Sequence, residues 1–247
     1  DRIRKGVLED IVFLSYMGLR PVLVHGGGPN ISDRMRKAGK KTDFVDGMRI
    51  TDKETLKIVE EELETLNKNI IDEIEKLGGK AKSFSTQTTS ILGVIKKKSK
   101  VDLGFVGKMV GMETQEIIKD ITSNIVPVIS PMGKDAKGTS YNVNADEVAY
   151  FVATSLRAIK FVLLTNVRGV MRNTDDANSL LSTIKENEAK QLIKDKVIQE
   201  GMIPKIQACF GAIDGGVQKA HIIDARIPHA LLLEIFTNKG IGTEILQ

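Results

Sequence analysis

Three consecutive glycines, Gly26–Gly28, separate an apolar segment at 21–24 from a segment at 30–38 that can form a helix. Glycine lets the backbone approach a ligand closely and adopt positive φ angles. At a helix N-terminus, the bare amide groups and the helix dipole attract negative charge. One or two glycines would be enough for a tight turn, so three in succession favour a loop that binds an anion.

The common motifs of nucleotide-binding loops are absent. Each Gly-Lys pair lacks the earlier glycine of a G-x-x-x-x-G-K-[ST] loop, and Ile31 stands where a G-x-G-x-x-G loop has its third glycine. A histidine followed by glycines also occurs in esterases, but the G-x-S-x-G nucleophile elbow of that class is missing. The only histidines are His25, His221 and His229, which argues against a hydrolase, and no ligand spacing indicates zinc.

Strand-like and helical segments alternate around this loop. We predict strands at 21–24, 80–84, 91–95, 105–110, 125–130, 160–170, 217–223 and 242–246, and helices at 5–17, 30–38, 51–77, from 113, 144–157, 186–195, 204–214 and 228–235. Thr51 and Glu54 have the spacing of a capping box that opens the long third helix. The alternation predicts an α/β protein, a three-layer α/β/α sandwich with a mainly parallel central sheet. We place a boundary between an N-terminal lobe, 1–158, and a C-terminal lobe, 159–247.

The composition of the chain argues against a membrane span and a nucleic-acid partner. The 247 residues are 41% hydrophobic and 28% charged, and no apolar run is long enough to span a membrane. The net charge is only +4, and the lysine run at 96–100 lacks interleaved aromatic residues, so it indicates a solvated hairpin tip and not a nucleic-acid site. Cys209 is the sole cysteine, which favours a reducing compartment, the cytoplasm or a plastid stroma. Since the sequence begins with neither Met nor a signal peptide, we expect a fragment or a processed form.

Six segments carry a family resemblance through their order and spacing. They are "GVLEDIVFLSYMGLRPVLVHGGGPNIS", "DGMRITD", "DLGFVGKM", "YNVNADEVA", "EGMIPKIQAC" and "HIIDARIPHALLLEIFTNKGIGTEIL". Almost from end to end, the sequence resembles the amino-acid kinase family, most closely the members that phosphorylate N-acetyl-L-glutamate. The resemblance implies the amino-acid kinase fold and transfer of a phosphoryl group from ATP to the γ-carboxylate of N-acetyl-L-glutamate, the second step of arginine biosynthesis. It also implies Mg²⁺ held mainly by the nucleotide phosphates, with no metal site on the protein.

The resemblance further implies roles for single residues. Gly27 and Gly28 would hydrogen-bond the substrate and the moving phosphoryl group, Arg49 would bind the α-carboxylate, and Asn142 would hold the substrate. Asp146 would orient the catalytic lysines, and Lys205 would neutralise charge that develops on the phosphoryl group. The nucleotide would contact Thr165, Gly169, Met202 and Lys205. Taken alone, the residue types also allow a surface salt bridge at Arg49, a first-turn helix acid at Asp146 and a solvent-exposed Lys205.

A further pattern concerns control. His221, Glu234 and Gly240 have the spacing found in family members that L-arginine inhibits, so the resemblance implies an arginine site. It also implies a homodimer that uses the 51–77 helix, a trimer of dimers in the full-length protein, and a PII regulatory protein as a candidate partner. The helix that links the dimers would lie upstream of Asp1.

Three departures from the family pattern leave alternatives open. The strand ending in Lys-x-Gly-Gly, whose lysine is the second catalytic cation, would precede the first residue. Residues 85–90, "STQTTS", replace a turn that usually contains Gly and Asp, and Asn166 stands where relatives usually have Asp. One alternative is a related enzyme such as glutamate 5-kinase, although "MRITD" and "NVNAD" argue against it. The other is a catalytically silent binding protein, for example an arginine-sensing partner of PII.

Overall fold

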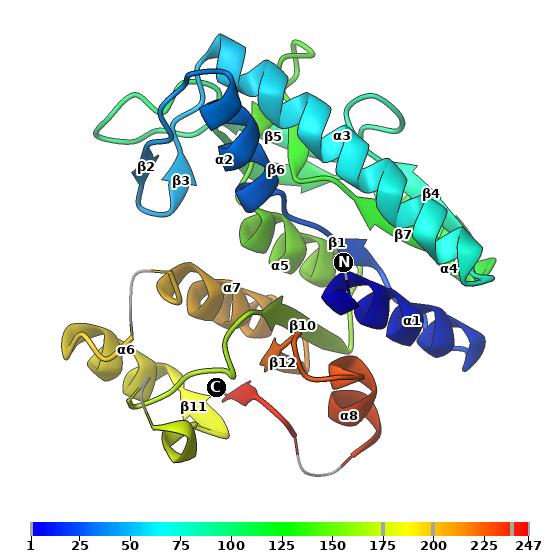
Figure 1. Ribbon diagram of the computed structural model, residues 1–247, viewed down its shortest axis with the longest axis vertical. Helices are drawn as coiled ribbons and strands as arrows, with labels where there is room; N and C mark the ends of the chain where they lie inside the picture. The colour runs from blue at the N-terminus through cyan, green and yellow to red at the C-terminus, as the bar shows by residue number, and fades with distance from the viewer. Residues whose placement is uncertain (1, 174–175, 199–200, 238–239, 247) are drawn as a thin grey trace. The chain divides into compact units, whose positions relative to one another are not determined.

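A computed structural model describes residues 2–173, 176–198, 201–237 and 240–246 (Figure 1). The chain forms two compact units, one made of Leu14–Val148 and the other of Asp1–Phe13 with Ala149–Gln247. This division differs from the boundary expected at 158, because it falls inside a continuous helix, α5 (Ala145–Ser155), and because the first residues group with the C-terminal unit. Which unit binds which substrate remains a prediction.

The unit made of 14–148 contains two sheets and a hairpin. Strands β1 (Leu23–Val24), β7 (Val126–Ile129) and β4 (Ala81–Phe84) form a parallel sheet in the order β1-β7-β4. A mixed sheet has the order β6-β5-β8-β9, and β2 pairs antiparallel with β3. These strands are β2 (Phe44–Val45), β3 (Met48–Arg49), β5 (Leu92–Lys96), β6 (Gly107–Met112), β8 (Met132–Lys134) and β9 (Ser140–Asn142).

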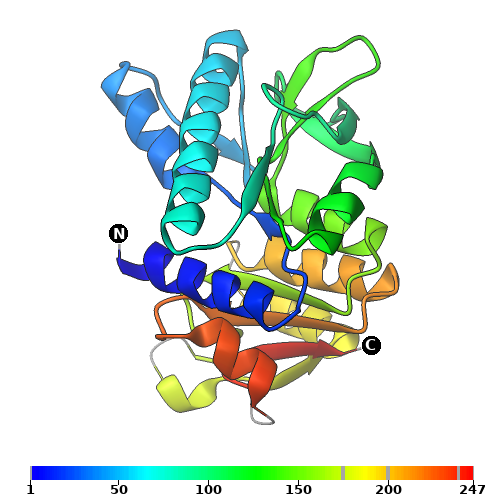
Figure 2. The same ribbon diagram turned by 90° about the vertical axis from the view of Figure 1, so that its right-hand side faces the viewer.

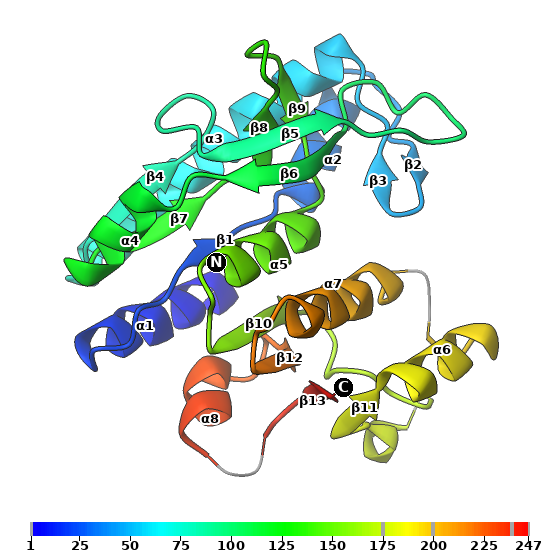
Figure 3. The same ribbon diagram turned by 180° about the vertical axis from the view of Figure 1, so that it is seen from behind.

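Helices cover both faces of the parallel sheet in this unit. Helix α3 (Lys53–Lys76) lies in front of the sheet in Figure 1, and α4 (Gln115–Thr122) lies in front of it in the reverse view of Figure 3. Helix α2 (Gly28–Lys37) packs beside α3, where the buried side chains Ile31 and Met35 meet Val59 and Leu63. All four residues of β7 are buried, as expected for a parallel strand with helices on both sides.

The second unit contains one mixed sheet in the order β10-β12-β13-β11, in which β10 and β12 run parallel. Figure 2 shows α1 and α8 on the near side of these strands, with α6 and α7 behind them. The elements are α1 (Arg2–Tyr16, which belongs to this unit up to Phe13), β10 (Lys160–Thr165), η1 (Ala177–Ser179), β11 (Thr183–Lys185), α6 (Glu186–Lys194), α7 (Ile203–Asp214), β12 (Lys219–Asp224), α8 (Ala230–Phe236) and β13 (Thr243–Leu246). The predicted α/β class, with mainly parallel strands between layers of helices, is confirmed.

The start of α3 corrects one expectation. Asp52, and not Thr51, caps this helix, because its carboxylate accepts a hydrogen bond of 2.6 Å from the backbone N–H of Thr55. Thr51 is fully buried, and its hydroxyl donates instead to the carbonyl oxygen of Arg49 over 2.8 Å. The capping box was therefore wrong: the backbone of Thr51 is paired with Leu103 and Phe105, which delays the helix by one residue.

No helix in the described part of the chain combines the length and the apolar character needed to cross a membrane.

The lysine run lies at the end of β5 and in the connection to β6, where Lys96 pairs with Asp102 and Lys97 with Glu147. Acidic neighbours thus offset part of its charge.

Candidate functional site

The glycine loop connects β1 to the N-terminus of α2. Gly27 is the N-cap residue, Pro29 lies in the first turn, and Ile31 donates the first helical hydrogen bond, to Gly27, over 2.9 Å. The first amide groups of a helix have no acceptor within the helix. Since Pro29 has no N–H, the amides of Gly28 and Asn30, together with that of the N-cap residue Gly27, are the ones available at this helix end for an anion.

The three glycines of this loop differ in the space that surrounds them. A Cβ atom on Gly27 would lie 2.8 Å from Cδ2 of Leu63, so packing against α3 excludes a side chain there. A Cβ atom on Gly28 would meet nothing within 4 Å. On Gly26 it would lie 3.7 Å from the Cβ of Ala145, the first residue of α5, so the N-terminus of a second helix lies beside the loop. Gly28 therefore borders open space at a position with free amide groups.

Arg49 is a buried cation with neutral partners. Its residue exposure is 5%, and its guanidinium donates to the carbonyl of Gly28 (3.1 Å), to Oγ of Ser32 (2.9 Å) and to Sδ of Met35 (3.3 Å). Its Cζ atom also lies 4.7 Å from the ring centroid of Phe44. Burial lowers the pKa of Arg49, but a guanidinium stays protonated.

Arg49 is buried and no ion pair of it occurs among the residues that the structure describes, so the predicted alternative of a surface salt bridge is wrong. A guanidinium has five N–H donors, and the three hydrogen bonds to Gly28, Ser32 and Met35 leave donors for a ligand. A buried charge without a counter-ion is costly. This arrangement therefore suits an anionic ligand, and a carboxylate fits the planar fork.

Asn142 is tied to Arg49 through one intermediate residue. Its side-chain amide donates to Oγ1 of Thr51 over 3.3 Å, and that hydroxyl donates to the carbonyl of Arg49. The backbone N–H of Asn142 also donates to Phe105. Two of the residues expected to hold the substrate, Arg49 and Asn142, thus belong to one hydrogen-bonded group.

Asp146 lies in the first turn of α5. Asn144 caps this helix, since its Oδ1 accepts from the backbone N–H of Asp146 (2.8 Å) and of Glu147 (3.1 Å). The helix dipole stabilises a carboxylate in the first turn. The alternative interpretation of Asp146 as a first-turn helix acid is therefore compatible with its position. Asp146 and Lys205 belong to different units, and the predicted role of Asp146 toward the lysines stays a prediction.

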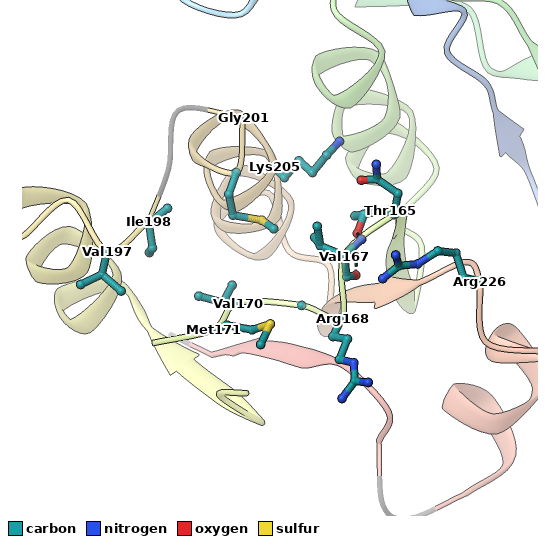
Figure 4. A pocket seen from close by; sticks show the side chains of 13 residues that line it. Thr165, Val167, Arg168, Val170, Met171, Val197, Ile198, Gly201, Lys205 and Arg226 are labelled. Atoms are coloured by element: carbon teal, nitrogen blue, oxygen red, sulfur yellow. Dashed lines mark hydrogen bonds between the residues drawn. The ribbon is translucent and has the colours of Figure 1, made fainter. Parts of the chain in front are cut away.

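The second unit contains a cavity of about 530 Å³ (Figure 4). The cavity lies where β10 and β12 end and α7 begins, which is the edge where parallel α/β sheets commonly bind ligands. All four residues predicted to contact the nucleotide line it. The lining residues are Thr165, Asn166, Val167, Arg168, Gly169, Val170, Met171, Val197, Ile198, Gly201, Met202, Lys205 and Arg226.

The two sides of this cavity differ in chemistry. In Figure 4, Val197 and Ile198 lie on one side, while Lys205 and Arg226 lie on the other, near Thr165. Lys205 occupies the first turn of α7, after Pro204, and is partly buried. A cation at that position opposes the helix dipole, which indicates a role beyond helix stability. An apolar side and a cationic side are what a purine base and a polyphosphate require.

Close packing shapes the loop that follows β10. Gly169 has φ of +139°, and a Cβ atom there would lie 2.6 Å from Oγ1 of Thr243. The same hydroxyl accepts from the N–H of Val170 over 2.9 Å. Across the cavity, Arg226 forms a two-point contact with Asp224 (2.9 and 2.8 Å), and this contact lowers the pKa of the Asp224 carboxyl. Much of the Arg226 charge is therefore compensated.

The three residues predicted to bind L-arginine lie close together in the unit that also contains the cavity. Nδ1 of His221 lies 2.8 Å from Oε1 of Glu234, and a Cβ atom on Gly240 would lie 3.1 Å from Oε2. Lys160 adds an ammonium group 3.3 Å from Glu234 and also donates to its backbone carbonyl over 3.1 Å. Burial alone would raise the pKa of Glu234, but the hydrogen bond and charge of His221, with Ile241 N–H and Lys160, bring the pKa to about 2.

Sequence reasoning missed several of these neighbours. Lys160 opens β10, seventy-four positions before Glu234, and nothing in its local pattern marks it. Arg226 could have been found, because it follows β12, the parallel neighbour of β10, and so belongs to the same sheet edge as Thr165.

No group of three or more His, Cys, Asp and Glu residues able to hold a metal occurs within the described ranges.

A buried cation beside an open glycine position in one unit, and a cavity with an apolar and a cationic side in the other, suit a kinase-type protein. The chain belongs to the amino acid kinase family, whose family model matches residues 2–224.

Individual relatives narrow the comparison. The chain is 47% identical to the acetylglutamate kinase of Petrotoga mobilis, over 100% of this chain and 83% of that protein. It is 42% identical to the acetylglutamate kinase of Desulforamulus reducens, over 99% of this chain and 86% of that protein. Among solved structures, N-acetylglutamate synthase of Neisseria gonorrhoeae shares the fold with a TM-score of 0.89 and 24% identity, covering 100% of this chain and 56% of that chain. The predicted family is confirmed, and the chain is an enzyme, a kinase that acts in amino-acid biosynthesis.

Proposed function

We propose that the protein transfers the γ-phosphoryl group of ATP to the γ-carboxylate of N-acetyl-L-glutamate. The relatives named acetylglutamate kinase support this substrate. The observation that carries the proposal is the buried guanidinium of Arg49, which has only neutral partners in the described chain and lies beside the open position at Gly28. Such a group can bind the α-carboxylate through two parallel hydrogen bonds.

The proposed chemistry asks for positioning and positive charge. Phosphoryl transfer spreads negative charge over three oxygens and needs little covalent work from the protein. Arg49 and Asn142 hold the substrate, and the amides of the Gly27–Gly28 loop bind the reacting oxygens. Lys205 neutralises the charge that develops on the phosphoryl group, and Asp146 orients the lysines.

The cavity lined by Thr165, Gly169, Met202 and Lys205 is proposed to bind ATP. Its apolar side suits the base, and its cationic side suits the phosphates. Mg²⁺ is expected to remain on the nucleotide phosphates and to shield their charge.

The reaction can be tested directly. A carboxylate kinase forms an acyl phosphate, which hydroxylamine converts to a coloured hydroxamate. With MgATP, we expect hydroxamate from N-acetyl-L-glutamate and little from L-glutamate, which carries an ammonium group in place of the acetamide. Faster reaction with L-glutamate would support a glutamate kinase. Saturable binding of N-acetyl-L-glutamate without ADP release would support the silent binding protein.

We further propose feedback inhibition by L-arginine at the group formed by His221, Glu234 and Gly240. The carboxylate of Glu234 is the chemical partner that a guanidinium needs. The proposal includes a homodimer, a trimer of dimers in the full-length protein, a PII partner, and a reducing compartment such as the cytoplasm or a plastid stroma. Sedimentation with and without arginine tests the assembly.

A further inference from the structure

A buried polar cluster lies behind the glycine loop, and none of the roles above uses it. His25 follows β1, Asn67 lies in the middle of α3, and Ser130 follows β7; their exposures are 7%, 0% and 2%. Nδ2 of Asn67 lies 3.1 Å from Nε2 of His25, 3.1 Å from Oγ of Ser130 and 3.0 Å from the carbonyl oxygen of Val128. Three segments distant in the sequence thus meet at the ring of His25.

The donors and acceptors of this cluster fix the protonation of His25. The carbonyl of Val128 can only accept, so the nitrogen of the Asn67 amide must face it. That nitrogen has two hydrogens, one for Val128 and one directed at Nε2 of His25 and Oγ of Ser130, and a donor facing Nε2 favours an unprotonated Nε2 in a neutral ring. The proton then lies on Nδ1, which donates to the carbonyl oxygen of Gly26 over 3.1 Å. Burial lowers the pKa of His25 to about 4, so the ring is neutral under ordinary conditions.

This hydrogen bond determines where the next amide points. The peptide that joins Gly26 to Gly27 is planar and trans, so its C=O and N–H groups point in opposite directions. Glycines have few restraints of their own on φ and ψ, and an external contact is needed to hold the plane. By fixing the Gly26 carbonyl, His25 fixes the direction of the Gly27 N–H.

We propose that His25 and Asn67 are positioning residues for the Gly27 amide: Asn67 sets the tautomer of His25, and His25 orients the peptide that presents this N–H to the reacting group. The catalytic use of Gly27 rests on the proposed function. The carboxamide oxygen of Asn67 has no hydrogen-bond partner among the described residues although it is buried. An unpaired buried acceptor lowers the stability of the fold. An asparagine at this position is therefore explained by its N–H donors and not by its oxygen.

Two substitutions at one position separate this role from a merely structural one. The amide nitrogen of His25→Asn replaces Nδ1, so it can still donate to Gly26 but is too short to reach Asn67. The longer amide of His25→Gln replaces Nε2, so it can still contact Asn67 and Ser130 but loses the donor to Gly26. Both variants remove the ring from the same buried position, and each is a control for the other.

We expect His25→Gln to lose on the order of 10²-fold in kcat, the usual effect of misplacing a group by about 1 Å. His25→Asn should stay within about tenfold of the unmodified protein, and the KM for N-acetyl-L-glutamate should change little in either variant. The Gly27 amide chemical shifts in NMR spectra should move in His25→Gln and stay near their original values in His25→Asn. Equal losses of kcat, or losses that follow the melting temperatures of the two variants, would overturn the proposal.

Asn67→Asp gives an independent readout. Its carboxylate replaces a donor with an acceptor beside Nε2 and raises the pKa of the His25 ring. The other groups that contact the ring, Gly26 and Ser130, do not titrate. Below the new pKa both ring nitrogens carry protons and the Gly26 bond persists; above it the remaining proton stays on Nε2 and that bond is lost.

The kcat of Asn67→Asp relative to the unmodified protein should therefore fall as the pH rises from about 6 to 9. A constant ratio would contradict the tautomer argument. If the unmodified protein does not phosphorylate N-acetyl-L-glutamate, the proposed function fails, and the Gly27 chemical shifts still decide whether His25 orients this peptide.

Discussion

Nη2 of Arg49 donates a hydrogen bond of 3.1 Å to the carbonyl oxygen of Gly28, the first residue of α2. The same nitrogen donates to Ser32, one turn further along the helix. The side chain proposed to bind the substrate carboxylate thus also holds the N-terminus of the helix whose amides are proposed to bind the reacting oxygens. A change at Arg49 should affect both ends of the bound substrate.

Arg49→Lys should raise the KM for N-acetyl-L-glutamate by about tenfold to a hundredfold. An ammonium group keeps the charge but cannot form two parallel hydrogen bonds to a carboxylate. Initial rates at varied substrate concentration measure the effect. An unchanged KM would remove Arg49 from the substrate site.

Lys205→Ala should lower kcat by about 10²–10³, equivalent to ~3–4 kcal/mol of transition-state stabilisation. The reason is that the lysine acts on charge that appears mainly in the transition state. Lys190→Ala is a matched control, because Lys190 is an exposed helix lysine paired with Glu186. A loss confined to KM, or an equal loss in the control, would contradict the role given to Lys205.

Sequence patterns located the long elements and most of the proposed site. The periodicity of the 51–77 segment predicted α3 because its apolar side chains, such as Val59, Leu63 and Ile74, meet one buried face. The glycine loop and the residues around Lys205 were found through local motifs. The strands β2, β3, β8, β9 and β11 were missed, since each has only two or three residues and too few positions to show a period.

Long-range contacts explain what else could not be predicted. Thr51 carries the sequence mark of a helix cap, yet its backbone pairs with a segment some fifty residues later and its hydroxyl turns to Arg49. Likewise, the neutral partners of Arg49 come from α2, so neither its burial nor its lack of a carboxylate partner is visible locally. The domain boundary lies inside a helix, where composition does not change.

Gly169→Ala should destabilise the protein by more than about 1 kcal/mol and weaken ATP binding. The backbone of Gly169 has a positive φ that residues with a side chain avoid, and the new methyl group would collide with Thr243. Both effects should displace the loop that lines the cavity. Thermal unfolding and nucleotide titration measure the two effects. Gly6→Ala in α1 is the control, because its Cβ atom would meet nothing and should stabilise the helix. Unchanged ATP affinity in Gly169→Ala would place the nucleotide elsewhere.

Asp52→Ala should reduce the free energy of unfolding by about 1 kcal/mol at neutral pH, the usual effect of losing an N-cap. The backbone N–H of Thr55 lowers the pKa of Asp52 to about 2, below the value of about 3.9 in an unfolded chain. A depressed pKa stabilises the folded state above the unfolded value, and this contribution disappears as the pH falls from about 4 to 2. The difference between the two proteins should shrink over that interval in urea titrations. Asp52→Asn, which still caps but does not titrate, should retain most of the stability.

Glu234→Gln should abolish inhibition by L-arginine, a coupling of about 1–3 kcal/mol, and should leave the uninhibited rate nearly unchanged. The amide has the shape of the carboxylate and can still accept from the N–H of Ile241, but it cannot neutralise a guanidinium. Lys160 should stay in place, because it also donates to the backbone carbonyl of Glu234. Glu244→Gln is the matched control on β13, since Glu244 lies 3.8 Å from the other nitrogen of His221 and is not expected to bind the effector. Rates measured in arginine and in the uncharged analogue citrulline decide the matter: inhibition that survives in Glu234→Gln, or equal inhibition by citrulline, would show that this carboxylate is not the arginine site.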